Sequence, residues 1–158
     1  MIKSWMVIGG VAIALAILSN VFLRPKGVKW FARLRRPRWL TFEKLIPIIW
    51  TIVFTCAAWS AYLVWEREPG TPKTWFMMGL YILLEVVTLS YNTVMLALRS
   101  LKVGVIIGGA GAILALLLAA TVLPLSGLAA ALLIPYLLWS PIGTYTTWEM
   151  MHLNPADV

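Results

Sequence analysis

The chain has 158 residues, of which 61% are hydrophobic and only 12% are charged, and its formal net charge is +7. A soluble domain is typically about 45–50% apolar and about 25% charged, so most of this chain has no water to face. The composition therefore excludes an ordinary soluble domain and indicates an integral membrane protein. The length predicts one domain over residues 1–158.

Five apolar segments are each long enough to cross the bilayer. A span of ~30 Å of hydrocarbon takes ~20 residues, and lipid offers no partners to exposed peptide groups, so each span must be helical. The predicted fold is an all-α integral membrane bundle of five transmembrane helices, at residues 5–23, 45–65, 75–98, 103–125 and 128–151. The first span is longer than the apolar part of a usual signal peptide, so we expect a retained helix.

The first loop, residues 24–44, is long and basic, and we expect it to act as a lid. Together with Arg99 and Lys102 it places ten of the thirteen basic residues on one side of the membrane. The positive-inside rule then puts the first loop and the C-terminus in the cytoplasm and the N-terminus outside. The charge could also attract anionic lipid head groups or an acidic ligand, or do nothing beyond setting the topology.

Two spans carry aromatic rings beside small residues on one helical face. On the second span these residues are Pro47, Trp50, Phe54, Ala57 and Ala61, and on the fifth they are Pro135, Tyr136, Trp139, Gly143 and Met150. Such faces leave room for a planar apolar guest, but ordinary helix packing explains the same pattern.

The third span carries a polar stripe at helical spacing, which consists of Tyr81, Glu85, Thr88, Asn92, Met95 and Arg99. A charge near the bilayer centre costs at least ~2.5–3.5 kcal/mol. Glu85 should therefore be a neutral acid that is hydrogen-bonded to a neighbouring helix, or it should face a wet cavity.

The fourth span has small residues at Gly104, Gly108 and Ala112, a spacing that lets helix backbones approach closely. The contact lies either within the monomer or between the subunits of a homodimer. The sequence contains no Gly-rich phosphate loop, and His152 with Cys56 does not make a metal site. No nucleophile has a base and an orienting group at predictable distance, so neither an enzyme nor a nucleic-acid-binding protein is indicated.

The sequence resembles the TspO/MBR family, the tryptophan-rich sensory proteins related to the translocator protein (peripheral benzodiazepine receptor), over nearly all of its length. The most specific match is Pro135-Tyr136-Leu137-Leu138-Trp139, followed by Glu149 and by Leu153-Asn154. The run Trp30-Phe31 through Pro37 and Trp39 also fits, as does Pro47-x-x-Trp50.

The chain departs from the family pattern at three places. Thr41-Phe42 replaces a Pro-Pro pair, and Thr88 with Tyr91 replaces Asn-x-x-Trp. No Lys or Arg follows Lys102, so we predict no C-terminal sterol site. The departures suggest a divergent bacterial member of the family, such as a cyanobacterial one.

The resemblance implies a homodimeric five-helix membrane protein that binds tetrapyrroles (haem, protoporphyrin IX or bilins) as ligands and requires no cofactor. The pocket would open toward the first loop and would be formed by Phe31, Trp39, Trp50, Thr88, Tyr91, Trp139 and Gly143. From charge density alone, we expect ligand propionates to pair with four arginines of this loop, Arg33, Arg35, Arg36 and Arg38.

Three functions remain open for such a protein. It could be a receptor or sensor linked to stress or tetrapyrrole regulation, a transporter of porphyrin-type ligands, or a porphyrin-degrading enzyme that uses tryptophans as redox partners. A structural membrane subunit without a ligand is the fourth possibility.

Overall fold

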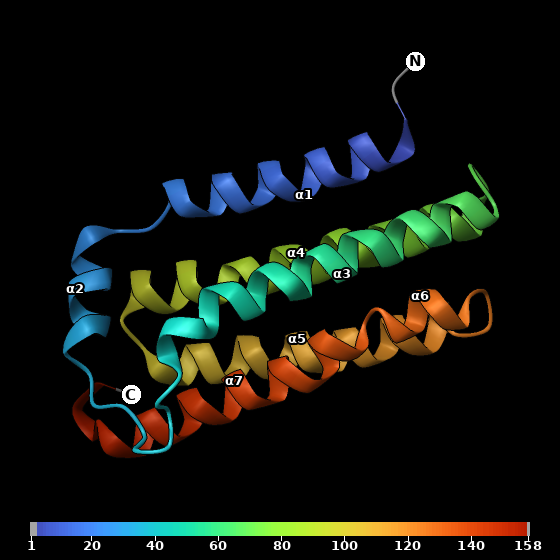
Figure 1. Cartoon of the computed structure of the whole chain (residues 1–158). Helices are drawn as coiled ribbons and strands as arrows, with labels where there is room; N and C mark the ends of the chain where they lie inside the picture. The colour runs from blue at the N-terminus through green and yellow to red at the C-terminus, as the bar shows by residue number, and fades with distance from the viewer. Residues whose placement is uncertain (1–2, 158) are drawn as a thin grey trace.

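The computed structural model describes residues 3–157, and five of its helices run side by side (Figure 1). The helices are α1 (Ser4–Val21), α2 (Pro25–Arg33), α3 (Ile46–Arg67), α4 (Pro72–Leu98), α5 (Leu101–Val122), α6 (Gly127–Ala131) and α7 (Ile134–Leu153), with short 3-10 turns at Glu43–Leu45 and Pro155–Asp157. The described part of the chain contains five helical segments long and apolar enough to cross a membrane. The predicted all-helical fold with five spans is therefore confirmed.

Local sequence signals explain where most helices begin. Thr71, Ser100 and Ser126 precede α4, α5 and α6, and each side chain accepts a hydrogen bond from a backbone N–H of the first turn. Proline occupies the first turn of α2, α3, α4 and α7, where its missing N–H is not needed. At the other end of α4, Arg99 adopts a left-handed conformation with φ 51° and terminates the helix.

The structure differs from the predicted segments at two places. The first loop contains the nine-residue helix α2, which crosses one end of the bundle (Figure 1). The fifth span is divided into α6 and α7 by a turn at Leu132 and Leu133. Pro135 has no backbone N–H that could donate to the carbonyl oxygen of Ala131, four positions earlier, so a continuous helix is interrupted in this region.

The two ends of the bundle differ in charge. We call the end that holds the first loop, the turn at Arg99 and the C-terminus the basic end (Figure 1). The opposite end holds the start of α1, the α3–α4 turn and the α5–α6 turn.

The core divides into two clusters of buried residues. The larger one lies between α3, α4, α5, α6 and α7. The smaller one lies at the basic end, where α2 packs on the bundle, and consists of Trp30, Leu34, Met95, Leu96, Leu101 and Met150. By contrast, α1 contacts α3 and α4 but buries no residue of its own. It is therefore the most loosely packed of the five spans.

The small residues of α5 pack inside the monomer. A side-chain carbon at Gly104 would lie 2.5 Å from Met95 Sδ, and one at Gly108 would lie 2.5 Å from Thr144 Oγ1. These approaches bring α5 close to α4 and α7, as small residues do between membrane helices. Of the two contacts that the sequence left open, this stripe makes the internal one.

Candidate ligand cavity

A cavity of about 580 Å³ lies between α1, α3 and α4. Its apolar wall includes Val7, Ile8 and Val11 from α1 and Phe54, Ala57, Ala58 and Ala61 from α3. Tyr81, Glu85 and Thr88 of α4 and Tyr136 of α7 supply polar groups. A volume in the ~300–1,000 Å³ range with a few convergent polar groups is typical of small-molecule sites.

The cavity belongs to the half of the bundle that is remote from the first loop. Ser4 at the start of α1, Trp65 near the end of α3 and Trp75 near the start of α4 all line it, and these three positions lie at the opposite end. The resemblance instead implied a pocket open toward the first loop. The smaller core cluster lies at the basic end, where residues of the first loop pack on the bundle.

Two of the hydroxyl groups that line the cavity, those of Tyr81 and Ser4, donate hydrogen bonds to identified acceptors. Ser60 Oγ donates to the carbonyl oxygen of Ala129 at 2.6 Å, so in its 2.5 Å contact with Tyr81 the tyrosine hydroxyl is the donor. At the opposite end, Ser4 Oγ donates to a carboxylate oxygen of Glu66 at 2.5 Å.

The same reasoning applies to Thr88 and Tyr136. Thr88 Oγ1 donates to the carbonyl oxygen of Leu84 at 2.6 Å, so in its 2.6 Å contact with Tyr136 the tyrosine hydroxyl is the donor. Together these bonds tie α4 to α3 and α7, and α3 to α6, around the cavity. They also leave none of the four lining hydroxyl protons free for Glu85.

Glu85 lines the cavity, and its side chain is neither fully buried nor fully exposed. Among residues 3–157, no group forms a hydrogen bond or an ion pair with its carboxyl group. Of the two environments expected for this acid, the structure shows the cavity and not a bond to a neighbouring helix.

Aromatic rings line one end of the cavity, and Trp50, which is outside the lining, lies behind its inner wall. Trp65 and Trp75 make an edge-to-face pair with centroids 5.0 Å apart, and both line the cavity. Trp50 packs edge-on against Tyr136 at 6.1 Å and so supports the inner wall from behind. Edge-to-face pairs stabilise such rings in fixed orientations.

The other predicted pocket residues lie outside the cavity lining. Trp139 is buried and packs against Phe42 at 6.3 Å, while the hydroxyl of Tyr91 bonds to Thr147. Gly143 is half-buried and faces open space. Of the polar stripe, Tyr81, Glu85 and Thr88 reach the cavity, whereas Asn92 is exposed.

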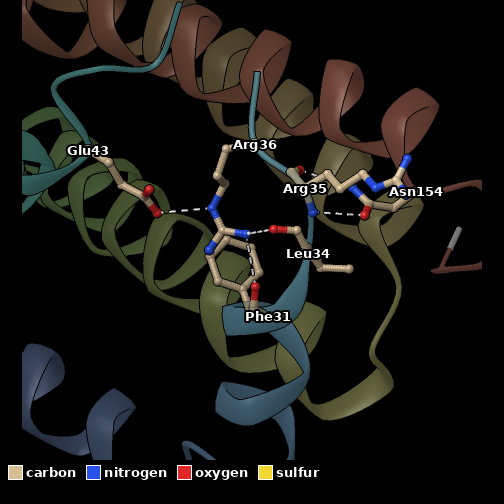
Figure 2. A network of polar contacts seen from close by, with 6 residues as sticks. All are labelled: Phe31, Leu34, Arg35, Arg36, Glu43 and Asn154. Carbon is tan, nitrogen blue, oxygen red and sulfur yellow. Dashed lines mark hydrogen bonds and ion pairs between the residues drawn. The ribbon is translucent and has the colours of Figure 1, made fainter. Parts of the chain in front are cut away.

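The first loop is fastened to the C-terminal segment. The indole N–H of Trp30 donates to Asp157 at 2.6 Å, and that of Trp39 donates to Glu149 at 2.5 Å. The side chain of Asn154 forms two hydrogen bonds with the backbone of Arg35: it accepts from the N–H at 2.9 Å and donates to the carbonyl oxygen at 3.1 Å. Figure 2 shows this pair beside the contacts of Arg36.

The loop arginines are only partly available to a ligand. Arg36 bonds to Glu43 at 3.0 Å and to the carbonyls of Phe31 and Leu34, and its guanidinium lies 4.5 Å above the Phe31 ring (Figure 2). Arg33 pairs with Asp157 at 3.1 Å. The side chains of the other two, Arg35 and Arg38, form no ion pair within the described residues, and all four lie at the basic end.

Several cavity residues were not selected from the sequence. Trp65 and Trp75 lie near helix ends, where indole rings also favour the membrane interface, and the α1 residues Ser4, Val7 and Ile8 carry no motif. The aromatic face of the second span was a usable signal, since Phe54, Ala57 and Ala61 do line the cavity. Within residues 3–157 there is no cluster of metal-ligating side chains.

The five apolar spans of the described chain define a multi-pass integral membrane protein. The sequence model of the TspO/MBR family matches residues 7–153, and the chain belongs to that family. The chain is 30% identical to the tryptophan-rich protein TspO of Bacillus cereus over 153 residues, which cover 96% of this chain and 97% of the relative.

Two further relatives match most of the chain. The human translocator protein is 27% identical over 145 residues, which cover 85% of this chain and 82% of the relative. An uncharacterized membrane protein of Bacillus subtilis, YtaB, is 26% identical over 135 residues, which cover 84% and 85% of the two chains.

Proposed function

We propose that this protein is a membrane receptor or sensor that binds a tetrapyrrole in the cavity between α1, α3 and α4, and that it serves stress or tetrapyrrole regulation. The observation that carries the proposal is the cavity itself, with its volume of about 580 Å³ and its aromatic walls. Flat rings such as Trp65, Trp75 and Phe54 suit a flat conjugated guest.

The position of the cavity suggests which basic residues meet the ligand's propionates. Arg67 and Lys73 lie two positions from the cavity residues Trp65 and Trp75, and Lys3 precedes Ser4. These three cations stand at the opposite end, whereas the loop arginines stand at the basic end. We therefore propose that propionates of a cavity-bound tetrapyrrole point toward the opposite end, and that Arg35 and Arg38 remain open to other anions.

A filled cavity tests this function directly. Ala58 lines the cavity, so Ala58→Phe places a ring inside it and should weaken binding of protoporphyrin IX about tenfold or more. Ala120 is exposed on α5, so Ala120→Phe adds the same ring to the lipid-facing surface and should leave binding unchanged. Affinities come from quenching of tryptophan fluorescence in lipid nanodiscs, with haem and biliverdin as further ligands.

Three outcomes would contradict the receptor proposal. Quenching that does not saturate with any of the three tetrapyrroles would favour a structural subunit. Saturable binding with movement of the ligand across proteoliposome membranes would favour a transporter. A progressive loss of the porphyrin absorption band with turnover would favour the degrading enzyme.

A further inference from the structure

Glu85 is the one charged residue in the cavity lining of the described chain. The nearest basic residues on its own helix are Lys73 and Arg99, which are 12 and 14 positions away and therefore about 18 and 21 Å along the axis. An acid without a cationic partner inside the membrane is expensive, and such residues typically mark ligand or ion sites.

The hydroxyl groups that line the cavity also offer no proton to this acid. The hydroxyl protons of Tyr81, Thr88 and Tyr136 are all committed to other oxygens, and that of Ser4 is committed to Glu66. A carboxylate only accepts hydrogen bonds, so a donor or a positive charge for Glu85 must come from a ligand bound in the cavity.

Like the acid, the remaining surface of the cavity favours a positively charged ligand. Trp65, Trp75 and Phe54 present aromatic rings, whose faces carry negative electrostatic potential and attract cations. The aliphatic residues from α1 and α3 add an apolar surface that favours a lipophilic body over a hydrated ion.

We infer that the cavity is a binding site for lipophilic cations, in which the Glu85 carboxylate is the counter-ion and the aromatic rings contact the charged body. The ligand class is a hydrophobic amine in its ammonium form or a permanently charged organic cation. This inference goes beyond the tetrapyrrole proposal and does not depend on it. The loose packing of α1, which forms one wall, allows guests of different shape.

Two synthetic ions of nearly equal shape and opposite charge provide the test. Tetraphenylphosphonium and tetraphenylborate are equilibrated with the full chain in phosphatidylcholine nanodiscs, and empty nanodiscs correct for partition into lipid. The protein should retain the cation in a saturable manner and should not retain the anion. Glu85→Gln should weaken cation binding about tenfold or more, which corresponds to ~1.4 kcal/mol.

The controls separate charge from folding. Glu85→Asp keeps the charge and should recover at least part of the affinity, while Glu68→Gln removes an acid outside the cavity and should bind as the parent protein does. Equal retention of the two ions, or unchanged cation binding in Glu85→Gln, would overturn the inference. Neither result bears on tetrapyrrole binding, which the Ala58→Phe experiment decides separately.

Discussion

Gly27 is a residue at which α2 comes very close to the backbone of α4. A side-chain carbon at this position would lie 2.2 Å from the backbone carbonyl oxygen of Leu96. Backbone cannot rotate away as a flexible side chain can, so α2 rests on the end of α4 only because position 27 has no side chain. Trp30 and Leu34 of the same segment are then buried against α4 and α5.

We therefore predict that Gly27→Ala lifts α2 from the basic end, at a cost of ~1–3 kcal/mol for the overpacked contact. Trypsin should cleave the variant faster within residues 24–44, and mass spectrometry of the fragments measures the rate. Gly79→Ala is the matched control, because a side chain there meets no atom within 4 Å. Cleavage at the same rate in both variants would contradict the role of this contact.

The first loop and the C-terminal segment are joined by several hydrogen bonds and behave as one unit. Asn154 binds the backbone of Arg35, while Asp157 accepts a hydrogen bond from Trp30 and forms an ion pair with Arg33. Trp39 adds a bond to Glu149 and stacks on Tyr145 at 6.2 Å. Through these contacts the loop tryptophans hold the first loop against the C-terminal segment at the basic end, away from the cavity.

Asn154→Ala should release this fastening. The backbone N–H of Arg35 would lose its partner, so its hydrogen exchange should accelerate about tenfold, which corresponds to ~1.4 kcal/mol of lost protection. Hydrogen–deuterium exchange with mass spectrometry over residues 34–38 measures the effect. Asn20→Ala removes an exposed asparagine that bonds only within α1, and this control should leave the loop protected.

The sequence predicted the five spans well because apolar length alone determines a membrane helix. It did not predict α2, since a nine-residue amphipathic helix carries a weak signal, although Pro25 and the spacing of Trp30 and Leu34 were available. It could not place the cavity, because helical periodicity tells which residues share a face but not which helix lies opposite. The homodimer remains a prediction.

The orientation across the membrane follows from the charge of the two ends, and we predict a cytoplasmic basic end. In a Cys56→Ala background, a cysteine introduced by Glu68→Cys should react with a membrane-impermeant maleimide on intact spheroplasts. A cysteine introduced by Lys26→Cys should react only after the membrane is opened. The reverse pattern would invert the assignment. Both positions are exposed, so accessibility within the fold does not confuse the result.

The fastened first loop also sets an order of events during synthesis. Trp30 is separated from Asp157 by 127 positions and Trp39 from Glu149 by 110. A ribosome that adds about 5–20 residues per second leaves Trp30 without its partner for roughly 6–25 s after it emerges. The basic end therefore closes only when α7 has entered the bilayer, and until then the indole of Trp30 needs the lipid surface or a chaperone to cover it.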